Sequence, residues 1–203
     1  MRRVAQPRYS TASGVSRRGE TRGDGALTAL DDIPMGMRPA RPFCFGVIGT
    51  TAAVVVQSLG GWICDKVWEG CNVRVSVVRH GDARALHILG VKRLYKYRPD
   101  EFMQHLPSLD GLAVTAELVD GDAGVAQVLR TILNLNRLRP TVWGQDAPTL
   151  LDTDWQPGEY WPSIAAQAFK AHAVMAAGQL PTTTSSESFR CASGVGRPPL
   201  SRY

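Results

Sequence analysis

Three short groups of polar residues, each directly after an apolar run, carry side chains that could do chemistry. They are Gly49, Thr50 and Thr51, then Arg79, His80 and Asp82, and finally Asp120 and Asp122. Free N–H groups at the start of a helix after Gly49 would favour a phosphate or a carboxylate. His80 could act as a general base oriented by Asp82, and the two later aspartates could share a divalent ion.

Each group also has a simpler structural explanation, which the sequence favours. A turn from a strand into a helix commonly uses a glycine and a threonine cap, as Gly49 and Thr51 would provide. A polar residue such as His80 after a strand is commonly just solvated. Asp120 and Asp122 flank a glycine, a pattern typical of a turn followed by a helix cap. The sequence therefore predicts no catalytic residue and no metal site, and these positions are candidates for ligand binding.

The apolar patterns predict the elements that would position these groups. Uncharged or alternating runs predict strands over residues 43–48, 72–78, 94–97 and 112–119. Apolar residues at steps of three and four predict helices over about 51–69, from 82 to about 90, from 125 to just before Pro140, and from about Pro162 to 178. The last helix carries an apolar stripe that we expect to face the core: Ile164, Ala168, Ala171 and Met175.

The alternation of strands and helices indicates an α/β fold with a mostly parallel sheet and right-handed crossovers. We expect a single three-layer domain over residues 43–180, either Rossmann-like or flavodoxin-like. Ligands of open parallel sheets bind beyond the carboxyl ends of the strands, near the point where the strand order reverses. That rule would bring the three polar groups to one edge of the sheet.

The net charge of +5 lies at the two ends of the chain. Residues 1–42 contain eight basic and four acidic residues, net +4; residues 43–180 contain twelve and thirteen, net −1; residues 181–203 contain three and one, net +2. Neither end has an apolar repeat. We therefore expect a disordered Arg-rich extension over 1–42, whose natural start could be Met35 or Met37, and a disordered tail over 181–203.

Two features bear on where the protein resides. The uncharged stretch 42–64 is long enough to span a bilayer, but its glycines and threonines predict a strand followed by a helix. The four cysteines form no Cys-x-x-Cys pair, which predicts buried or incidental thiols. A reducing, cytoplasmic location without a membrane partner is the resulting expectation.

Familiar site motifs are missing from the sequence, and one basic segment remains. Residues 46–51 depart from Gly-x-Gly-x-x-Gly, and Walker A, Gly-x-Ser-x-Gly and His-Glu-x-x-His motifs do not occur. Over residues 92–98 two tyrosines interleave with the cations Lys92, Arg93, Lys96 and Arg98. Such a pattern can hold single-stranded nucleic acid, but so short a run, in a nearly neutral domain, is more typical of a solvated face.

One stretch of the chain is similar to a known group of proteins. It begins with Gly60-Gly61-Trp62 and Asp65-Lys66, continues with the valine-rich run 73–77, and ends with Leu-x-Ile-Leu-Gly over 86–90. These features, within residues 60–97, resemble small actinobacterial α/β proteins without an assigned activity. The resemblance implies a bacterial α/β protein and carries no site residue or cofactor.

These observations favour a non-enzymatic α/β binding or regulatory module, with any ligand held near Thr50, His80 and Asp120. One alternative is an enzyme that acts on a phosphorylated or nucleotide substrate in the same crevice, with His80 as the base. A second alternative is nucleic-acid binding through residues 92–98, which we regard as the weaker one. A small anionic ligand or a protein could be the partner, and the sequence leaves both the partner and the cofactor unknown.

Overall fold

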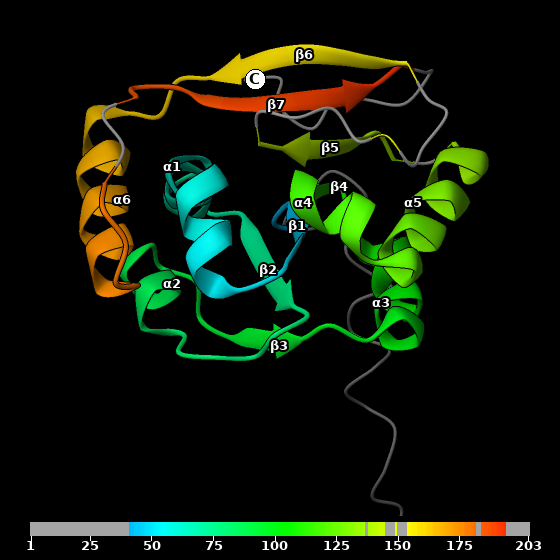
Figure 1. Ribbon diagram of the computed structural model, residues 1–203, viewed down its shortest axis with the longest axis horizontal. Helices are drawn as coiled ribbons and strands as arrows, with labels where there is room; N and C mark the ends of the chain where they lie inside the picture. Colours follow the sequence, from blue (N-terminus) through cyan, green and yellow to red (C-terminus); the bar gives the residue numbers. More distant parts are fainter. Residues whose placement is uncertain (1–40, 137, 145–148, 150–153, 182–183, 194–203) are drawn as a thin grey trace, which may run out of the picture. The chain divides into compact units, whose positions relative to one another are not determined.

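The computed structural model describes residues 41–136, 138–144, 149, 154–181 and 184–193, and Figure 1 shows how they are arranged. Within them, seven strands form one sheet in the order β3-β2-β1-β4-β5-β7-β6. The strands are β1 Cys44–Gly49, β2 Asn72–Val77, β3 Leu94–Lys96, β4 Gly111–Thr115, β5 Pro140–Trp143, β6 Trp155–Tyr160 and β7 Glu187–Ala192. Residues 1–40 of the expected extension and 194–203 of the expected tail lie outside the described residues.

The sheet is mostly parallel, as predicted. β1 pairs in parallel with β2 and β4, β2 with β3, and β4 with β5, so that Val47 of β1 lies between Val75 and Ala113. The order β3-β2-β1-β4-β5 is the one found in Rossmann folds, whereas a flavodoxin order would place the third strand beside the first. β7 runs antiparallel to both β5 and β6.

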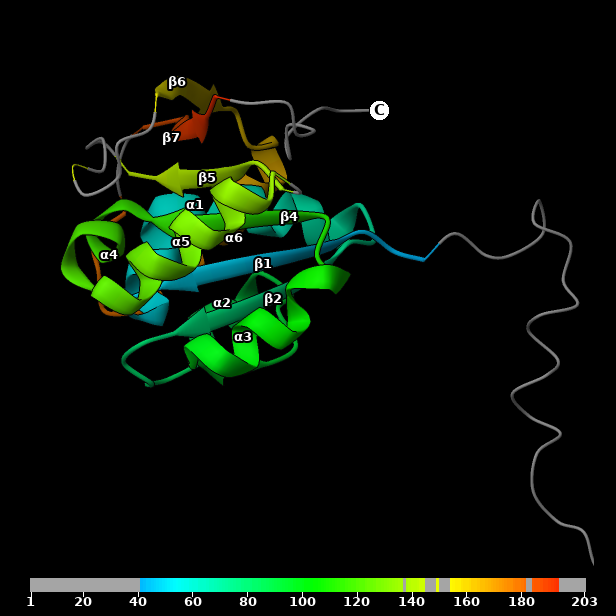
Figure 2. The same ribbon diagram turned by 90° about the vertical axis from the view of Figure 1, so that its right-hand side faces the viewer.

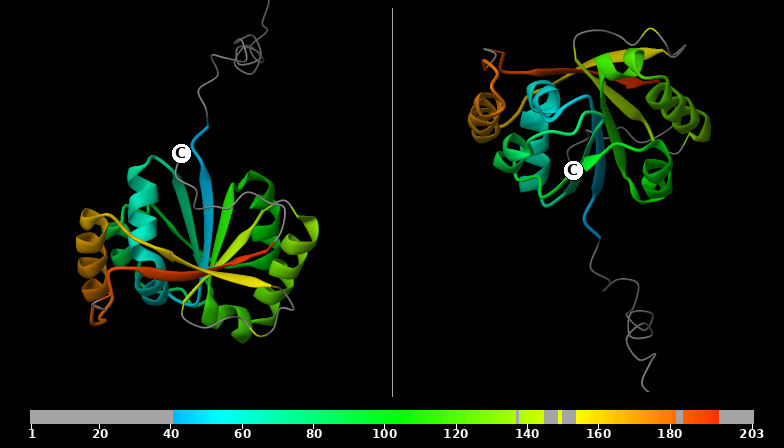
Figure 3. Two further views of the ribbon diagram at one scale, coloured as in Figure 1. Left: turned by 90° about the horizontal axis from the view of Figure 1, so that it is seen from above. Right: turned by 60° about the horizontal axis from the view of Figure 1, so that its bottom comes forward.

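Helices cover both faces of the sheet (Figures 2 and 3). They are α1 Ala52–Trp68, α2 Arg84–Ile88, α3 Pro99–His105, α4 Ala116–Gly121, α5 Ala123–Leu135 and α6 Ile164–Ala176. Helices α1 and α2 pack on one face, and α3, α4 and α5 on the other. α6 packs against α1 and α2, outside that layer.

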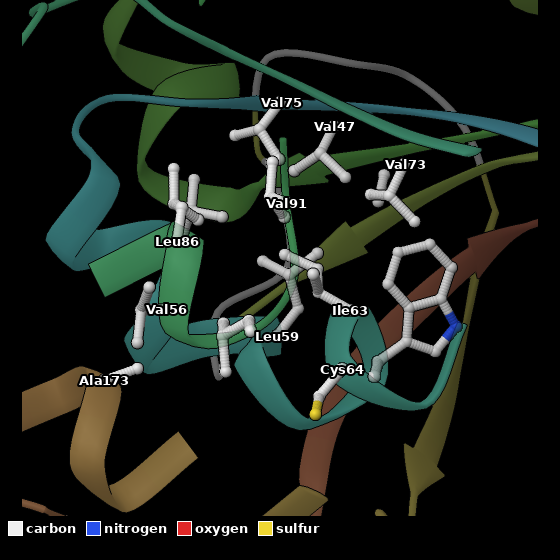
Figure 4. Close-up of a cluster of buried hydrophobic side chains, with 14 of the residues drawn as sticks. Val47, Val56, Leu59, Ile63, Cys64, Val73, Val75, Leu86, Val91 and Ala173 are labelled. Atoms are coloured by element: carbon white, nitrogen blue, oxygen red, sulfur yellow. The ribbon is translucent and has the colours of Figure 1, made fainter. Parts of the chain in front are cut away.

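Each face of the sheet has its own hydrophobic core, because successive residues of β1 and β4 point to opposite sides. The core on the α1 side joins β1, β2, α1 and α2 (Figure 4), and includes Val47, Leu59, Ile63, Val75 and Leu86. The core on the α5 side includes Ile48, Leu112, Val114, Leu129 and Ile132. Strand β1 is buried along its whole length, as its uncharged sequence predicted.

Helix α1 is interrupted where the sequence has two consecutive glycines. Leu59 has non-helical angles (φ −141°, ψ 24°), so that a second helical segment starts at Gly60-Gly61. The carboxylate of Glu187 accepts hydrogen bonds from the N–H groups of Gly61 (2.8 Å) and Trp62 (2.9 Å). The weak helix formers thus mark a kink that a side chain from β7 caps.

Two expectations about the elements are wrong, and two strands were not predicted. The strand expected over 112–119 ends at Thr115, where the chain turns into α4. The tail expected over 181–203 contains strand β7, so the domain does not end at residue 180. β5 and β6 were not expected either, and they pair with β4 and β7. A short polar strand such as β7 is stable because it hydrogen-bonds to β5 on one side and to β6 on the other. The composition of the segment alone does not predict this pairing.

The apolar stripe of the last helix does not face the core as expected. Ile164 is 88% exposed and Met175 is 51% exposed, and Ala168 is exposed as well. Ala166, Ala173 and Val174 are buried in their place.

The stretch 42–64 forms strand β1 and most of α1. Among the described residues, the helices are too short or too polar to cross a membrane.

Candidate functional site

The strand order reverses between β1 and β4, which makes the carboxyl ends of these strands the candidate functional site. The chain leaves β1 through α1 on one face of the sheet and leaves β4 through α4 and α5 on the other. A crevice opens where neighbouring strands send their connections to opposite faces, and ligands of open sheets bind there. The backbone N–H of Arg79 donates to the carbonyl of Thr50 (2.8 Å), so the end of β2 joins the same edge.

The turn after β1 is built by Gly49, Thr50 and Thr51. A Cβ on Gly49 would lie 2.3 Å from Cγ2 of Val55, so glycine lets α1 approach the strand. The hydroxyl of Thr51 accepts a hydrogen bond from the N–H of Val54 (3.3 Å) and caps α1. The N–H groups of Ala52 and Ala53 precede the first intrahelical hydrogen bond, so they are donors at the positive end of the helix dipole.

The turn after β2 carries Arg79, His80 and Asp82, all of them exposed. The carboxylate of Asp82 accepts a hydrogen bond from the N–H of Arg84 (2.8 Å) and closes the turn before α2. This contact gives Asp82 a structural role. His80 directly follows Arg79, whose backbone bonds the Thr50 turn, so it belongs to the same edge of the sheet.

At the end of β4 the structure places a residue that sequence reasoning missed, Thr115. Its side chain is 1% exposed, and its hydroxyl has no hydrogen-bond partner. A Cβ on Gly49 would lie 3.7 Å from this oxygen, so the hydroxyl is beside the end of β1. The sequence predicts a strand that runs on to residue 119, which would place Thr115 in its interior. The exposed Glu117 follows in the first turn of α4.

Asp120 and Asp122 lie beyond this edge and have structural partners. Asp120 lies in the last turn of α4 and accepts a hydrogen bond from the N–H of Thr149 (2.9 Å). Asp122 caps α5 and accepts from the N–H groups of Gly124 (2.9 Å) and Val125 (3.1 Å). They follow the strand end by five and seven residues, so they do not belong to the turn that leaves β4. Over the described parts of the chain, His, Cys, Asp and Glu side chains do not gather in groups of three or more that could hold a metal ion.

The four thiols do not add reactive groups to the site. Burial raises the pKa of Cys64 to about 11 and raises the pKa values of Cys44, Cys71 and Cys191 as well. All four are free cysteines. A thiol with a raised pKa stays protonated near neutral pH and is a poor nucleophile and metal ligand.

The basic segment 92–98 surrounds β3, whose pairing partner within the described chain is β2. Its four cations are divided between two hollows. Lys92 and Arg93 line one of about 520 Å³, and Lys96 and Arg98 line another of about 60 Å³. Charged side chains along an edge strand prevent pairing with a second sheet. This role explains the segment without a nucleic-acid ligand.

Comparison with known proteins identifies the fold. No family model and no curated sequence matches the chain. Among solved structures, a triple mutant of a deacetylase of teicoplanin biosynthesis has 14% sequence identity and a TM-score of 0.54, over 77% of this chain and 99% of that one. The zinc-inhibited form of teicoplanin deacetylase has 13% identity and a TM-score of 0.55, over 78% and 100%. The N,N'-diacetylchitobiose deacetylase of Pyrococcus horikoshii has 12% identity and a TM-score of 0.50, over 83% and 93%.

These neighbours overturn the interpretation of the chain as a non-enzymatic binding or regulatory module. The three solved structures compared above are deacetylases, which are enzymes. The sequence interpretation went wrong because it equated the lack of a familiar motif with the lack of an activity. The resemblance to actinobacterial proteins over residues 60–97 stays a prediction.

Proposed function

We propose that the chain is a hydrolytic enzyme that cleaves an acyl amide at the carboxyl edge of β1, β2 and β4. The observation that carries the proposal is the fold, which extends over 99% of a deacetylase of teicoplanin biosynthesis. A single sheet with one switch point offers one main crevice for a ligand. The substrate class follows from the neighbours, which remove acetyl groups.

The described residues do not fit a bound catalytic metal ion. The turn after β1 carries Thr50, Thr51 and two alanines, and Asp82 and Asp122 are engaged with backbone N–H groups. A hydrolytic metal site needs three protein ligands around one open position, which these residues do not supply. The proposed step therefore uses protein groups alone.

In this step a water molecule attacks the carbonyl carbon of the amide while His80 accepts a proton from the water. The N–H groups of Ala52 and Ala53 stabilise the negative charge on the carbonyl oxygen at the start of α1. The C–N bond then breaks, and the nitrogen leaves as an amine after taking the proton from His80. The products are a carboxylic acid and an amine.

The test is release of acetate by the full chain from a panel of N-acetylated compounds that includes N,N'-diacetylchitobiose. We expect turnover that survives EDTA, and a loss of about 100-fold in kcat for His80→Ala. His87→Ala is the matched control, because His87 is an exposed histidine on α2, and it should keep full activity.

Three outcomes would contradict the proposal at separate points. If no compound is hydrolysed with or without added divalent ions, the hydrolase assignment fails. If EDTA abolishes turnover, the metal-free step is wrong. If His80→Ala and His87→Ala behave alike, His80 is not the base.

A further inference from the structure

Helix α6 exposes three large apolar side chains to the solvent, although it buries Ala166, Ala173 and Val174 and turns two polar side chains toward the rest of the domain. Lys170 bonds Glu187 across 2.6 Å, and the amide of Gln167 donates to the carbonyl of Pro162 (2.9 Å). Ile164, Phe169 and Met175 are 88%, 39% and 51% exposed. A surface helix is expected to turn such large apolar side chains toward the core.

The orientation of α6 is held by polar contacts at its amino end. The Asp65 carboxylate on α1 accepts hydrogen bonds from the N–H (2.9 Å) and hydroxyl (2.6 Å) of Ser163, and from the hydroxyl of Tyr160 (2.9 Å). Ser163 in turn caps α6. Together with the Lys170–Glu187 pair, these contacts lock the rotation of the helix. The exposed apolar face is therefore built into the fold.

The apolar surface continues beyond the helix itself. Trp68 at the end of α1 is 57% exposed and packs edge-on against Phe169, with ring centroids 5.2 Å apart. We call the surface formed by Trp68, Ile164, Ala168, Phe169 and Met175 the α6 patch. In both views of Figure 3, α6 lies at the outside of the described domain. Contiguous exposed apolar surface of this kind marks an interaction site.

The chemistry of the α6 patch suits a second copy of this chain. His172 is the ionisable residue on the exposed arc of α6, because Lys170 is turned inward. Glu69, which follows Trp68, is paired with Lys66 (2.6 Å), so its charge is compensated within the protomer. Attachment to an anionic membrane needs lysines or arginines beside the apolar face. The alanines at 165, 168 and 176 would let two helices approach to the usual 8–10 Å.

The exposed area is sufficient for a dimer. If a large side chain has about 200 Å² of surface, the α6 patch and its neighbours on the helix expose roughly 600 Å² per protomer. Two such surfaces would bury roughly 1,200 Å² in total, which is the lower bound for a specific interface. We propose that the α6 patch is the interface of a homodimer, in which α6 of one protomer packs antiparallel against α6 of its partner about a two-fold axis.

The first test is sedimentation velocity and light scattering of the full chain at about 50 µM. We expect twice the mass of one chain for the wild type, and a single-chain mass for Ile164→Glu/Met175→Glu. Both positions are exposed, so these changes should leave the far-UV spectrum unchanged. The control is Leu135→Glu on α5, where an equally exposed leucine (52%) lies off the patch and the dimer should persist.

The second test addresses the orientation of the helices. Ala168 lies near the middle of α6, so in an antiparallel pair it meets its own copy. We expect Ala168→Cys to form an intermolecular disulfide on mild oxidation, whereas the wild type and Leu135→Cys form none. A dimer that resists this cross-link would overturn the antiparallel arrangement.

Other results of the first test would overturn the interface itself. A wild-type monomer, or a dimer unaffected by Ile164→Glu/Met175→Glu, excludes the α6 patch as a dimer contact. A monomer that floats with phosphatidylcholine vesicles, and loses this property in the double variant, would assign the patch to a membrane surface instead.

Discussion

The side chain of Glu187 is buried and held by three polar contacts. It is 3% exposed, and its carboxylate takes hydrogen bonds from two N–H groups of α1 and from Lys170. Burial raises the pKa of Glu187 above its ordinary value, although Lys170 and the N–H groups oppose the shift. The residue joins β7, the kink of α1 and α6 at one point, beside a cavity of about 190 Å³.

Replacing Lys170 by methionine should show how much free energy it costs to bury the Glu187 carboxylate without its paired cation. We expect a loss of about 3 kcal/mol in the free energy of unfolding at pH 8, because an unpaired buried charge remains. Since the folded chain with a raised Glu187 pKa binds the proton more tightly than the unfolded chain, stability falls as the pH rises through that pKa. The variant should therefore approach the wild type below the ordinary pKa of 4.5.

Urea unfolding of both proteins at pH 4 and pH 8 measures this difference. Lys96→Met, which removes an exposed lysine from β3, is the matched control and should be neutral at both pH values. An equal loss for Lys170→Met at pH 4 and pH 8 would show that the packing of the side chain, and not the charge of Glu187, sets its contribution.

Gly61 should tolerate no side chain. A Cβ at this position would lie 2.5 Å from Cγ of Pro162 and 3.1 Å from Oε1 of Glu187. We expect Gly61→Ala to lower the free energy of unfolding by about 2 kcal/mol through overpacking. Gly121→Ala is the control, because a Cβ there meets nothing within 4 Å. Thermal unfolding that ranks the two variants equally would contradict this explanation of the glycine pair.

At the scale of elements, helix caps explain residues that resembled a site. Asp122 satisfies two N–H groups at the start of α5. We expect Asp122→Ala to cost about 1 kcal/mol of stability, whereas Asp122→Asn should cost little, since asparagine caps equally well. Chemical denaturation of the two variants measures the difference. A melting temperature that rises with Mg²⁺ in the wild type, and not in Asp122→Asn, would instead support an ion at Asp120 and Asp122.

The motif with which the actinobacterial resemblance begins, over residues 60–66, also has structural duties. The glycines form the kink, Trp62 packs between Phe45 and Trp143 at ring distances of 5.4 and 5.5 Å, and Asp65 anchors α6. These roles depend on partners far away in the sequence. The unusual residues of this motif therefore serve tertiary contacts and do not indicate a catalytic or binding site.

At the scale of the whole molecule, topology and surface decide the function. The parallel strands bring Thr50, Arg79 and Thr115 from the ends of β1, β2 and β4 to one edge, where we place the hydrolytic site. The α6 patch belongs to the α1 and α2 side of the domain, where we place the dimer contact. Site and interface thus rest on different elements, and their tests are independent.

The sequence by itself determined the α/β class, the parallel core strands, the first turn at Gly49-Thr50-Thr51 and the burial of β1. These features follow from local periodicity and composition, which act over a few residues. It could not determine that β4 stops at Thr115 or that a polar segment forms β7. It also could not determine that α6 turns its apolar stripe outward, because the rotation depends on Asp65 and Glu187, which lie on other elements. Only the tertiary structure brings such partners together, and it decided where the site and the exposed surface lie.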